Sequence, residues 1–571
     1  MKISRTTFIA AWATVGPVHA QTLKPFVRFV TVIALLAALA GMATAQTILP
    51  RHRLGVTTPQ QISANHPLTR NSGSNWTPLT NQLCTAGNPC FPAGVTMLLT
   101  DGSVLVHEEQ DGFQQNWFKL TPDIFGSYVN GTWSQVASIP PALNYSPLFF
   151  GSSVIADGRV AVIGGEVNFN TYVWTNQGAI YDPVADTWTN VPPPVGWTTI
   201  GDAQSMNLAN GTYMQANCCA TQWAYLNPTT LAWTQFSGNG KFDVFDEEGW
   251  SMLPNGKVLT VDAYVFQYDA VGMNSELYDP RSRTWSSAGS TVVQLWDSDC
   301  GNSTNATFEV GPAVLRPDGT VFATGANTCG TGHTAIYNSH NGKWTAGPDF
   351  PVPNVSIADG PAALETNGKV LMMGSVNEQP PSTFFEWDGK DLNVIPGPPN
   401  APNAGSFYGH LLVLPTGQIM YTDWLYPGFG ATADVELFTP SGSYNPAWAP
   451  KIVAVQATEE EAEEYPDGKA VRLTRGKTGI VYGYRLSGMS EGGAYGDDYQ
   501  PSTNYALVRV TNNATGHVFY CRTHNPSSYL VQNTALEYTK FDVPAGAETG
   551  PSMLVAVTNG IPSRPISVTV H

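Results

Sequence analysis

The fold of this chain is indicated by one stretch, Ala156-Asp157-Gly158-Arg159-Val160-Ala161-Val162-Ile163-Gly164-Gly165, which is followed by Tyr181-Asp182-Pro183 and Trp188. The stretch is typical of a tight turn at Gly158 that leads into an apolar strand. The later residues are typical of a third strand, a turn and a fourth strand. Such units recur at intervals of roughly 45–60 residues, the length of a four-stranded blade in a β-propeller. The repeat therefore predicts a propeller.

The repeat occurs seven times, as counted by its turn glycines, which are Gly102, Gly158, Gly211, Gly256, Gly319, Gly368 and Gly417. Only six closing tryptophans accompany them: Trp133, Trp188, Trp233, Trp285, Trp344 and Trp387. The last blade thus lacks an outer strand. We expect Trp76-Thr77-Pro78-Leu79, which precedes the first blade, to supply that strand and to remove a free sheet edge.

The pattern changes at Pro450, after which seven or eight short alternating strands follow within about 120 residues. This pattern is typical of an immunoglobulin-like sandwich. We therefore expect an all-β chain with four parts: a targeting segment at residues 1–45, an N-terminal segment at 46–82 whose strand closes the last blade, a seven-bladed propeller at 83–449, and the sandwich at 450–571.

The first 45 residues read as an export signal. Lys24 and Arg28 precede an apolar run from Phe29 to Met42, and Ala43-Thr44-Ala45 provides a small-residue cleavage site. The run is too short for a comfortable membrane span, so we expect a secreted or periplasmic/extracellular protein whose mature chain has no transmembrane segment. Removing the four basic residues of this segment takes the formal net charge from −17 to −21, which disfavours nucleic acid as a partner.

The cysteines agree with an oxidising compartment. Cys84 with Cys90 and Cys300 with Cys329 are candidate disulfides. Cys218 and Cys219 are neighbours, so a vicinal disulfide and a pair of free buried thiols are both open, and Cys521 is left over. None of them has the CxxC spacing of a zinc site.

The whole chain from about residue 75 resembles the galactose oxidase and glyoxal oxidase family, which joins a kelch-type propeller to a C-terminal early set domain. The resemblance rests on the blade repeat and on the ending Val543-Pro544, Pro551-Ser552-Met553-Leu554-Val555 and Gly560-Ile561-Pro562-Ser563. It implies a copper site of two tyrosines and two histidines, with one tyrosine cross-linked to a cysteine.

Those ligands match this sequence poorly. The cysteine position falls on Ala93 and the cross-linked tyrosine position falls on Phe149. Near Gly417 the tyrosine–histidine pair falls on Phe407-Tyr408, with His410 displaced by two, and His524 is the match for the histidine of the C-terminal domain. The resemblance therefore implies the architecture but little of the copper-radical chemistry.

Carboxylates stand where the inner strands begin. Inner strands start at one rim of a propeller channel, so we expect a ligand or metal site there, with candidates Asp202, Glu247, Glu248, Glu309, Asp359, Tyr408, His410 and His524, and with His107, Glu166, Asp262 and Asp423 on the rim. Oxygen ligands favour calcium or manganese, whereas added imidazole favours copper. A purely structural polar channel stays open.

These features favour an exported, non-oxidase binding protein that holds a carbohydrate (glycan), a small polar ligand or a divalent cation at the acidic channel mouth. Trp197, Trp250 and Trp424 are candidates for stacking on sugars. The alternative is a divergent copper-dependent oxidase of alcohols, aldehydes or sugars that uses Tyr408, His410 and His524. A carboxylate-based hydrolase or lyase is a third reading.

Overall fold

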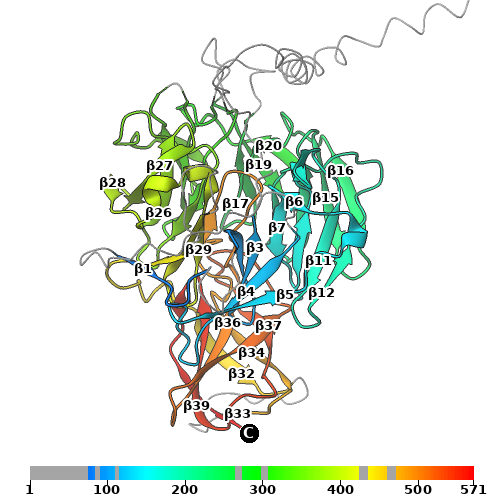
Figure 1. The fold of residues 1–571 in the computed structure, drawn as a ribbon, viewed down its shortest axis with the longest axis vertical. Helices are drawn as coiled ribbons and strands as arrows, with labels where there is room; N and C mark the ends of the chain where they lie inside the picture. Colours follow the sequence, from blue (N-terminus) through cyan, green and yellow to red (C-terminus); the bar gives the residue numbers. More distant parts are fainter. Residues whose placement is uncertain are drawn as a thin grey trace, which may run out of the picture. The chain divides into compact units, whose positions relative to one another are not determined.

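The computed structural model describes residues 75–83, 91–109, 115–263, 273–297, 307–328, 330–423, 435–458 and 471–571 (Figure 1). Regular structure in these ranges is almost entirely β, with three single-turn 3-10 helices: η1 (Pro141–Leu143), η3 (Ala401–Asn403) and η4 (Ser406–Tyr408). No helix within the described ranges has the length and apolar character needed to cross a membrane. The predicted all-β class is confirmed.

Within the described ranges the propeller shows seven antiparallel sheets, numbered here in chain order. Sheets 1 to 3 are β2–β5 (Ala93–Leu98, Val104–Glu108, Trp117–Thr121, Thr132–Val136), β7, β8, β11 and β12 (Gly151–Val154, Val160–Ile163, Gly178–Asp182, Thr187–Asn190), and β13–β16 (Ser205–Asn207, Tyr213–Asn217, Gln222–Asn227, Ala232–Ser237). Sheets 4 and 5 are β17–β20 (Trp250–Met252, Val258–Val261, Ser275–Asp279, Thr284–Ser287) and β21–β24 (Ala313–Leu315, Thr320–Thr324, Thr334–Asn338, Lys343–Ala346).

Sheets 6 and 7 each include a strand from elsewhere in the chain. Sheet 6 is β25–β28 (Ala362–Leu364, Val370–Val376, Gln379–Trp387, Leu392–Ile395) with β35 (Gly493–Ala494) added at its inner edge. Sheet 7 is β29–β31 (Gly409–Val413, Ile419–Asp423, Glu436–Phe438), and β1 (Trp76–Pro78) pairs with β31 as its outer strand. A small sheet of β6 (Pro147–Leu148), β9 (Val167–Asn168) and β10 (Thr171–Tyr172) accompanies sheet 2.

The repeated tryptophans explain how neighbouring sheets are joined. The indole Nε1 of Trp188 in sheet 2 donates to Ala137 O at the end of sheet 1 (2.7 Å), and Trp233 in sheet 3 donates to Pro192 O after sheet 2 (2.7 Å). Trp133 in sheet 1 donates to Asn81 O, just after β1 (3.0 Å), which links the first sheet to the last. Trp133 and Trp188 are buried and Trp233 is half-buried, and the indole donor of each of these three finds a carbonyl beside a neighbouring sheet.

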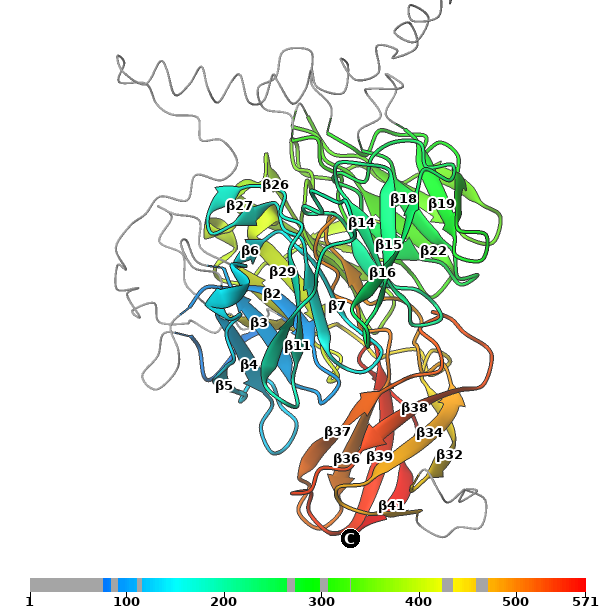
Figure 2. The same ribbon diagram turned by 90° about the vertical axis from the view of Figure 1, so that its right-hand side faces the viewer.

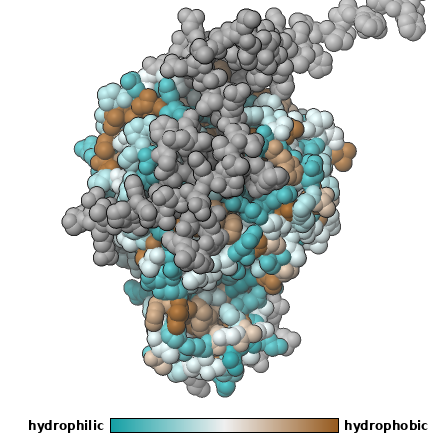
Figure 3. Space-filling model, in the orientation of Figure 1, coloured by the Kyte–Doolittle hydropathy of each residue, from teal (hydrophilic) through white to brown (hydrophobic). Residues whose placement is uncertain are grey.

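The C-terminal strands form the predicted sandwich. They are β32 (Lys451–Gln456), β33 (Val471–Leu473), β34 (Thr478–Tyr484), β36 (Leu507–Asn512), β37 (Val518–His524), β38 (Glu537–Asp542), β39 (Gly550–Thr558), β40 (Ile561–Pro562) and β41 (Ile566–Val570) (Figure 2). Alternate residues of β34 are buried, as expected for a strand with one face on a core. Hydrophilic and hydrophobic residues are interspersed on the face drawn in Figure 3, as on an ordinary protein surface.

One loop of the sandwich region belongs to the propeller. Residues 486–505 separate β34 from β36, and β35 within them pairs with the innermost strand of sheet 6, with Ala362 opposite Ala494. The hydroxyl of Tyr499 donates to Thr96 O of β2 (2.5 Å), and that of Tyr505 donates to Leu98 O. We call residues 486–505 the inserted loop, because these bonds fix it among the inner strands.

Candidate functional site

A residue with positive φ precedes the inner strand of each of sheets 2 to 6. Phe149, Gly201, Glu247, Phe308 and Asp359 precede β7, β13, β17, β21 and β25, with φ of 54°, 69°, 60°, 63° and 40°. A side-chain-bearing residue in this region costs on the order of 1–3 kcal/mol and is concentrated at functional sites. Two of the five, Glu247 and Asp359, are predicted site residues, so the turn itself places carboxylates at the channel mouth.

Three of the predicted carboxylates meet. Oxygen atoms of Glu247, Glu309 and Asp359 all lie within 4.8 Å of one another, and the three side chains are buried. Glu247 also belongs to a second group with Asp202 and Asp246, again within 4.8 Å. We call these five residues the mouth cluster. Two oxygens bound to one Ca²⁺ ion at about 2.4 Å lie at most about 4.8 Å apart, so the spacing suits a single ion.

The inserted loop brings two more carboxylates that the sequence analysis missed. Asp497 and Asp498 are 2% and 3% exposed. Asp497 Oδ2 and Asp498 Oδ1 have no hydrogen-bond partner among the described residues. Gly496 makes the approach possible, because a Cβ on it would lie 2.0 Å from Asp359 Oδ1.

The electrostatics of the mouth cluster are dominated by repulsion. Burial raises the pKa of Glu247 well above its usual range, and Glu309, Asp497 and Asp202 raise it further. Burial also raises the pKa of Asp497, with contributions from Asp498, Asp202 and Glu309. The pKa of Asp498 is raised by burial and then by Asp359 and Asp202. The charges that act most strongly on these groups are therefore other carboxylates. A divalent cation would reverse this balance and favour the ionised forms.

Glu248 and Asp262 were predicted to face this site and do not. They surround the fully buried Lys241, whose Nζ lies 2.8 Å from Glu248 Oε1 and 4.0 Å from Asp262 Oδ1. Asp243 and Glu276 complete this lysine cluster, with Glu276 Oε2 at 2.7 Å. The backbone turns at Glu247, whose φ is 60°, and Glu248 therefore enters different surroundings from its neighbour.

A separate small pocket contains the predicted His410. It is lined by Val95, Glu109, Phe149, Phe407, His410, Tyr495 and Asp498. The His410 ring lies parallel to that of Tyr495, with centroids 5.5 Å apart, and burial lowers the pKa of His410. His107 Nδ1 lies 3.5 Å from Glu109 Oε1. Although burial alone would raise the pKa of Glu109, His107 and His410 hold it below its usual range.

His524 is not at the channel mouth, which corrects the prediction. Its Nε2 lies 3.2 Å from Asp542 Oδ1 on the neighbouring strand of the sandwich. The next residue, Asn525, donates its N–H to Ala156 O, in the turn after β7. That turn is at the far end of β7 from Phe149, roughly 20 Å away at 3.3 Å per residue. The inserted loop, rather than residues 522–524, is the part of the sandwich that reaches the mouth.

The remaining predicted residues have other surroundings. Tyr408 is buried at the end of η4, edge-on to Phe407. Asp423 accepts hydrogen bonds from Tyr421 Oη (3.2 Å) and from Asn400. The backbone carbonyl of Glu166 accepts from Val173 N (3.0 Å), and its side chain is only half-buried. In the part of the chain that the structure describes, neither Glu166 nor Asp423 is grouped with the carboxylates of the mouth cluster.

The residues present do not fit the copper-radical centre that the resemblance implies. Phe149 and Phe407 stand at the two expected tyrosine positions with ring centroids 5.4 Å apart, and neither offers a metal ligand. Ala93 stands at the cysteine position, so no thioether can form. With His524 held in the sandwich, Tyr408, His410 and His524 are not assembled as one ligand set.

Of the predicted disulfides, the structure describes only Cys218–Cys219, which is bonded. Cys84, Cys90, Cys300 and Cys329 lie outside the described residues, and Cys521 is a buried free thiol. Trp197 and Trp250 are 5% and 1% exposed, so they pack in the core and do not offer a stacking surface as predicted. Trp424 lies outside the described residues.

Comparisons with known proteins bear on the architecture. No family model matches the chain. A kelch-like protein, terF, of Aspergillus terreus is 28% identical over 129 residues, which cover 22% of this chain and 26% of that protein. The chain thus matches about a quarter of this curated relative.

Among solved structures, a fungal alcohol oxidase of the AA5 family in complex with copper has a TM-score of 0.46 at 14% identity, covering 87% of this chain and 99% of its own. A catalytically inactive virginiamycin B lyase from Staphylococcus aureus has a TM-score of 0.41 at 8% identity, covering 64% and 98%. Together with the sheet topology, the kelch-like relative agrees with the architecture that the blade repeat predicted: a kelch-type propeller followed by a β-sandwich.

Proposed function

We propose that this protein is an exported binding protein whose channel mouth holds one hard divalent cation, Ca²⁺ or Mn²⁺, and that the ion binds hydroxyl groups of a glycan or another small polar ligand. The observation that carries the proposal is the meeting of Glu247, Glu309 and Asp359 oxygens within 4.8 Å inside the protein. Hard cations prefer such oxygen sites, and Ca²⁺ takes six to eight ligands. Where the protein carboxylates supply fewer oxygens than this, the remaining coordination positions on the ion are open to a polar ligand.

The alternative of a purely structural polar channel accounts less well for the same residues. In such channels polar groups cap backbone amides or bond to one another, which satisfies them. Asp497 Oδ2 and Asp498 Oδ1 are deeply buried and make no hydrogen bond with described residues. The charged groups that act most strongly on these two residues are also carboxylates. A bound cation would therefore stabilise the site by offsetting their repulsion.

Export is supported by the leader-like pattern of residues 1–45 and by the Cys218–Cys219 disulfide, because disulfides persist mainly in oxidising compartments. An extracellular site also meets millimolar Ca²⁺, for which weak extracellular modules are adapted.

Calorimetric titration of the mature protein, first freed of metal with a chelator, tests the proposal. We expect about one Ca²⁺ or Mn²⁺ per chain, and loss of binding in Glu309→Gln and Asp359→Asn. Asp318→Asn is the matched control, because Asp318 is 51% exposed in the β21–β22 turn, at the far end of the strand that Glu309 precedes. Absence of binding in the wild type, or equal binding in all three variants, would refute the proposal.

The same titration also distinguishes the mouth cluster from the copper centre of the oxidase alternative. The mouth cluster offers oxygen ligands, whereas a copper centre is expected to use imidazole. We therefore expect Glu309→Gln to abolish calcium binding while His410→Ala leaves it intact.

A further inference from the structure

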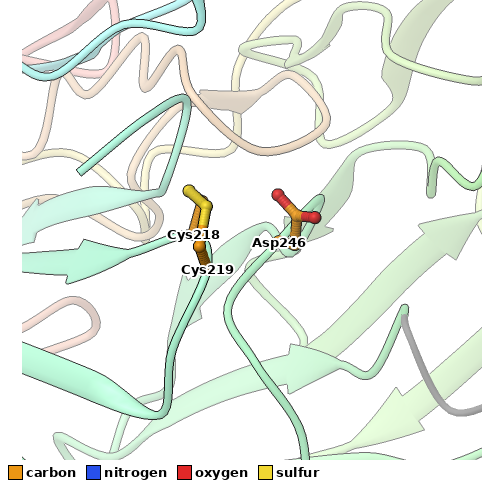
Figure 4. Close-up of side chains that lie close together, drawn as sticks. All are labelled: Cys218, Cys219 and Asp246. Atoms are coloured by element: carbon orange, nitrogen blue, oxygen red, sulfur yellow. A yellow bond between two sulfur atoms is a disulfide. The ribbon is translucent and has the colours of Figure 1, made fainter. Parts of the chain in front are cut away.

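The vicinal disulfide borders the mouth cluster. Cys218 and Cys219 form the turn between β14 and β15, and Figure 4 shows their bonded sulfurs facing Asp246 from a neighbouring segment. The two sulfur atoms and a carboxylate oxygen of Asp246 lie within 4.8 Å of one another. Asp246 is also part of the group with Asp202 and Glu247. Asp246 therefore links the disulfide to the carboxylate group that contains Glu247.

The backbone of this turn is fixed independently of the disulfide. Cys218 N donates to Ile200 O (2.9 Å), and the side chain of Asn217 accepts from Thr199 Oγ1 (2.9 Å) and from Cys219 N (3.4 Å). Gly201 leaves room for the sulfur, because a Cβ there would lie 2.5 Å from Cys218 Sγ. Breaking the sulfur–sulfur bond should therefore leave both side chains on the same side of the turn.

We propose that the Cys218–Cys219 disulfide is reducible and that, once reduced, these two cysteines and Asp246 form a second metal site for a thiophilic divalent ion such as Zn²⁺. A dithiol reductant supplies two electrons and two protons; the sulfur–sulfur bond breaks, two thiols form, and the reductant becomes a disulfide. Zn²⁺ then displaces the two thiol protons to solvent and binds two thiolates and one carboxylate.

The geometry suits this ligand set. At Zn–S of about 2.3 Å and Zn–O of about 2.1 Å, tetrahedral coordination places the sulfurs about 3.8 Å apart and each sulfur about 3.6 Å from the carboxylate oxygen. Both separations fall within the 4.8 Å that encloses the three ligand atoms. Small side-chain rotations about a fixed turn are sufficient. Thiolates select Zn²⁺ over Ca²⁺, whereas the all-carboxylate group selects hard ions.

The exposure of Cys219 and Asp246 also favours a metal site that forms after reduction. Cys218 is fully buried, but Cys219 and Asp246 are half-buried, so a reductant and then an ion can approach from the Cys219 side. Because Asp246 belongs to both groups, zinc in the thiolate site should weaken Ca²⁺ binding at the mouth cluster. This last coupling, unlike the thiolate site itself, rests on the proposed function.

Cobalt(II) is the probe for the test, since thiolate coordination gives it an intense charge-transfer absorption. The full mature protein is titrated with Co²⁺ before and after treatment with a phosphine reductant. We expect no thiolate signal in the oxidised protein and a signal that saturates near one Co²⁺ per chain in the reduced protein. Cys219→Ser should abolish it, Asp246→Asn should weaken Co²⁺ at least tenfold, and Cys521→Ser should leave it unchanged.

The sequence contains five cysteines besides this pair, so the variants decide the assignment. The proposal is overturned if the reduced wild type gives no signal, if the signal survives Cys219→Ser, or if thiol counting shows that the Cys218–Cys219 bond resists the reductant in the folded protein. Calcium binding by the oxidised protein is measured separately, so failure of the thiolate site and failure of the proposed function are distinguishable.

Discussion

Lys241 is the residue whose removal should damage the propeller most clearly. Its side chain is fully buried, with Glu276 and Glu248 at 2.7 and 2.8 Å and Asp243 in contact. Although burial acts to lower the pKa of Lys241, the four surrounding carboxylates raise it well above its usual range. Lys241→Met therefore leaves buried carboxylates without their cation, a change that typically costs about 3–5 kcal/mol.

The expected loss can be expressed as a melting temperature. Unfolding a domain of about 370 residues changes entropy by about 0.8 kcal/mol per kelvin, so a loss of 3–5 kcal/mol corresponds to about 4–6 °C. Differential scanning calorimetry measures this shift. Lys257→Met is the matched control, because Lys257, in the turn between β17 and β18, is 35% exposed and its Nζ lies 3.4 Å from Asp279 Oδ2. It should change stability by no more than about 0.5 kcal/mol.

The loss should also depend on pH. Burial, opposed by Lys241, raises the pKa of Glu248 and Asp262 above their ordinary values of 4.5 and 3.8. Above those values the folded protein holds more protons than the unfolded chain, so its stability falls as pH rises. Without Lys241 these pKa values rise further, and the cost of Lys241→Met should grow from pH 5 to pH 8. A loss below 1 kcal/mol, or one that does not shrink at pH 5, would refute this account.

Three further predictions concern the mouth cluster. In metal-free protein Glu309→Gln should raise the free energy of unfolding, by about 3.5 kcal/mol for one ionised pair at the 4.8 Å limit of separation and an effective dielectric constant of 20, while abolishing the calcium-induced rise in melting temperature; a metal-free variant less stable than wild type would contradict this. Gly496→Ala should weaken Ca²⁺ at least tenfold in calorimetry, since the new Cβ would lie 2.0 Å from Asp359 Oδ1; unchanged affinity would show that Asp359 is not a ligand. Because the pKa values of Glu247 and Asp497 are raised, Ca²⁺ binding should release protons and weaken from pH 8 to pH 5 by about tenfold per unit for each proton released; titrations in buffers of different ionisation enthalpy count those protons.

Much of the propeller could be predicted because the repeat has the same physical task in every sheet. Gly158 has φ of 83° in its turn, which favours glycine. Trp188 packs at 5.0 Å on Tyr181 of its own sheet and at 5.2 Å on Trp117 of the preceding one. Such local requirements recur at a fixed interval and are visible in one sequence.

The candidate site could be predicted only in part. Asp202, Glu247, Glu309 and Asp359 come together because inner strands begin at one rim, which topology alone dictates. Glu248 could not be separated from Glu247, since its direction depends on a lysine seven residues earlier that captures it. Asp497 and Asp498 depend on which sandwich loop enters the channel. The sequence did hold a signal for this loop. Residues 486–505 are long for a connection and contain several glycines and acidic residues, and long loops in compact domains are usually functional.

The inserted loop has a consequence for biosynthesis. Asp497 and Asp498 are synthesised after all seven sheets, and β35 pairs with sheet 6 through Ala362 and Ala363. A chain that has emerged only as far as Phe438 therefore contains the mouth cluster but not the two carboxylates of the loop. Acquisition of the ion is expected to mark completed translation and docking, so a prematurely terminated chain would be recognisable to proteolytic quality control by its open, metal-free channel.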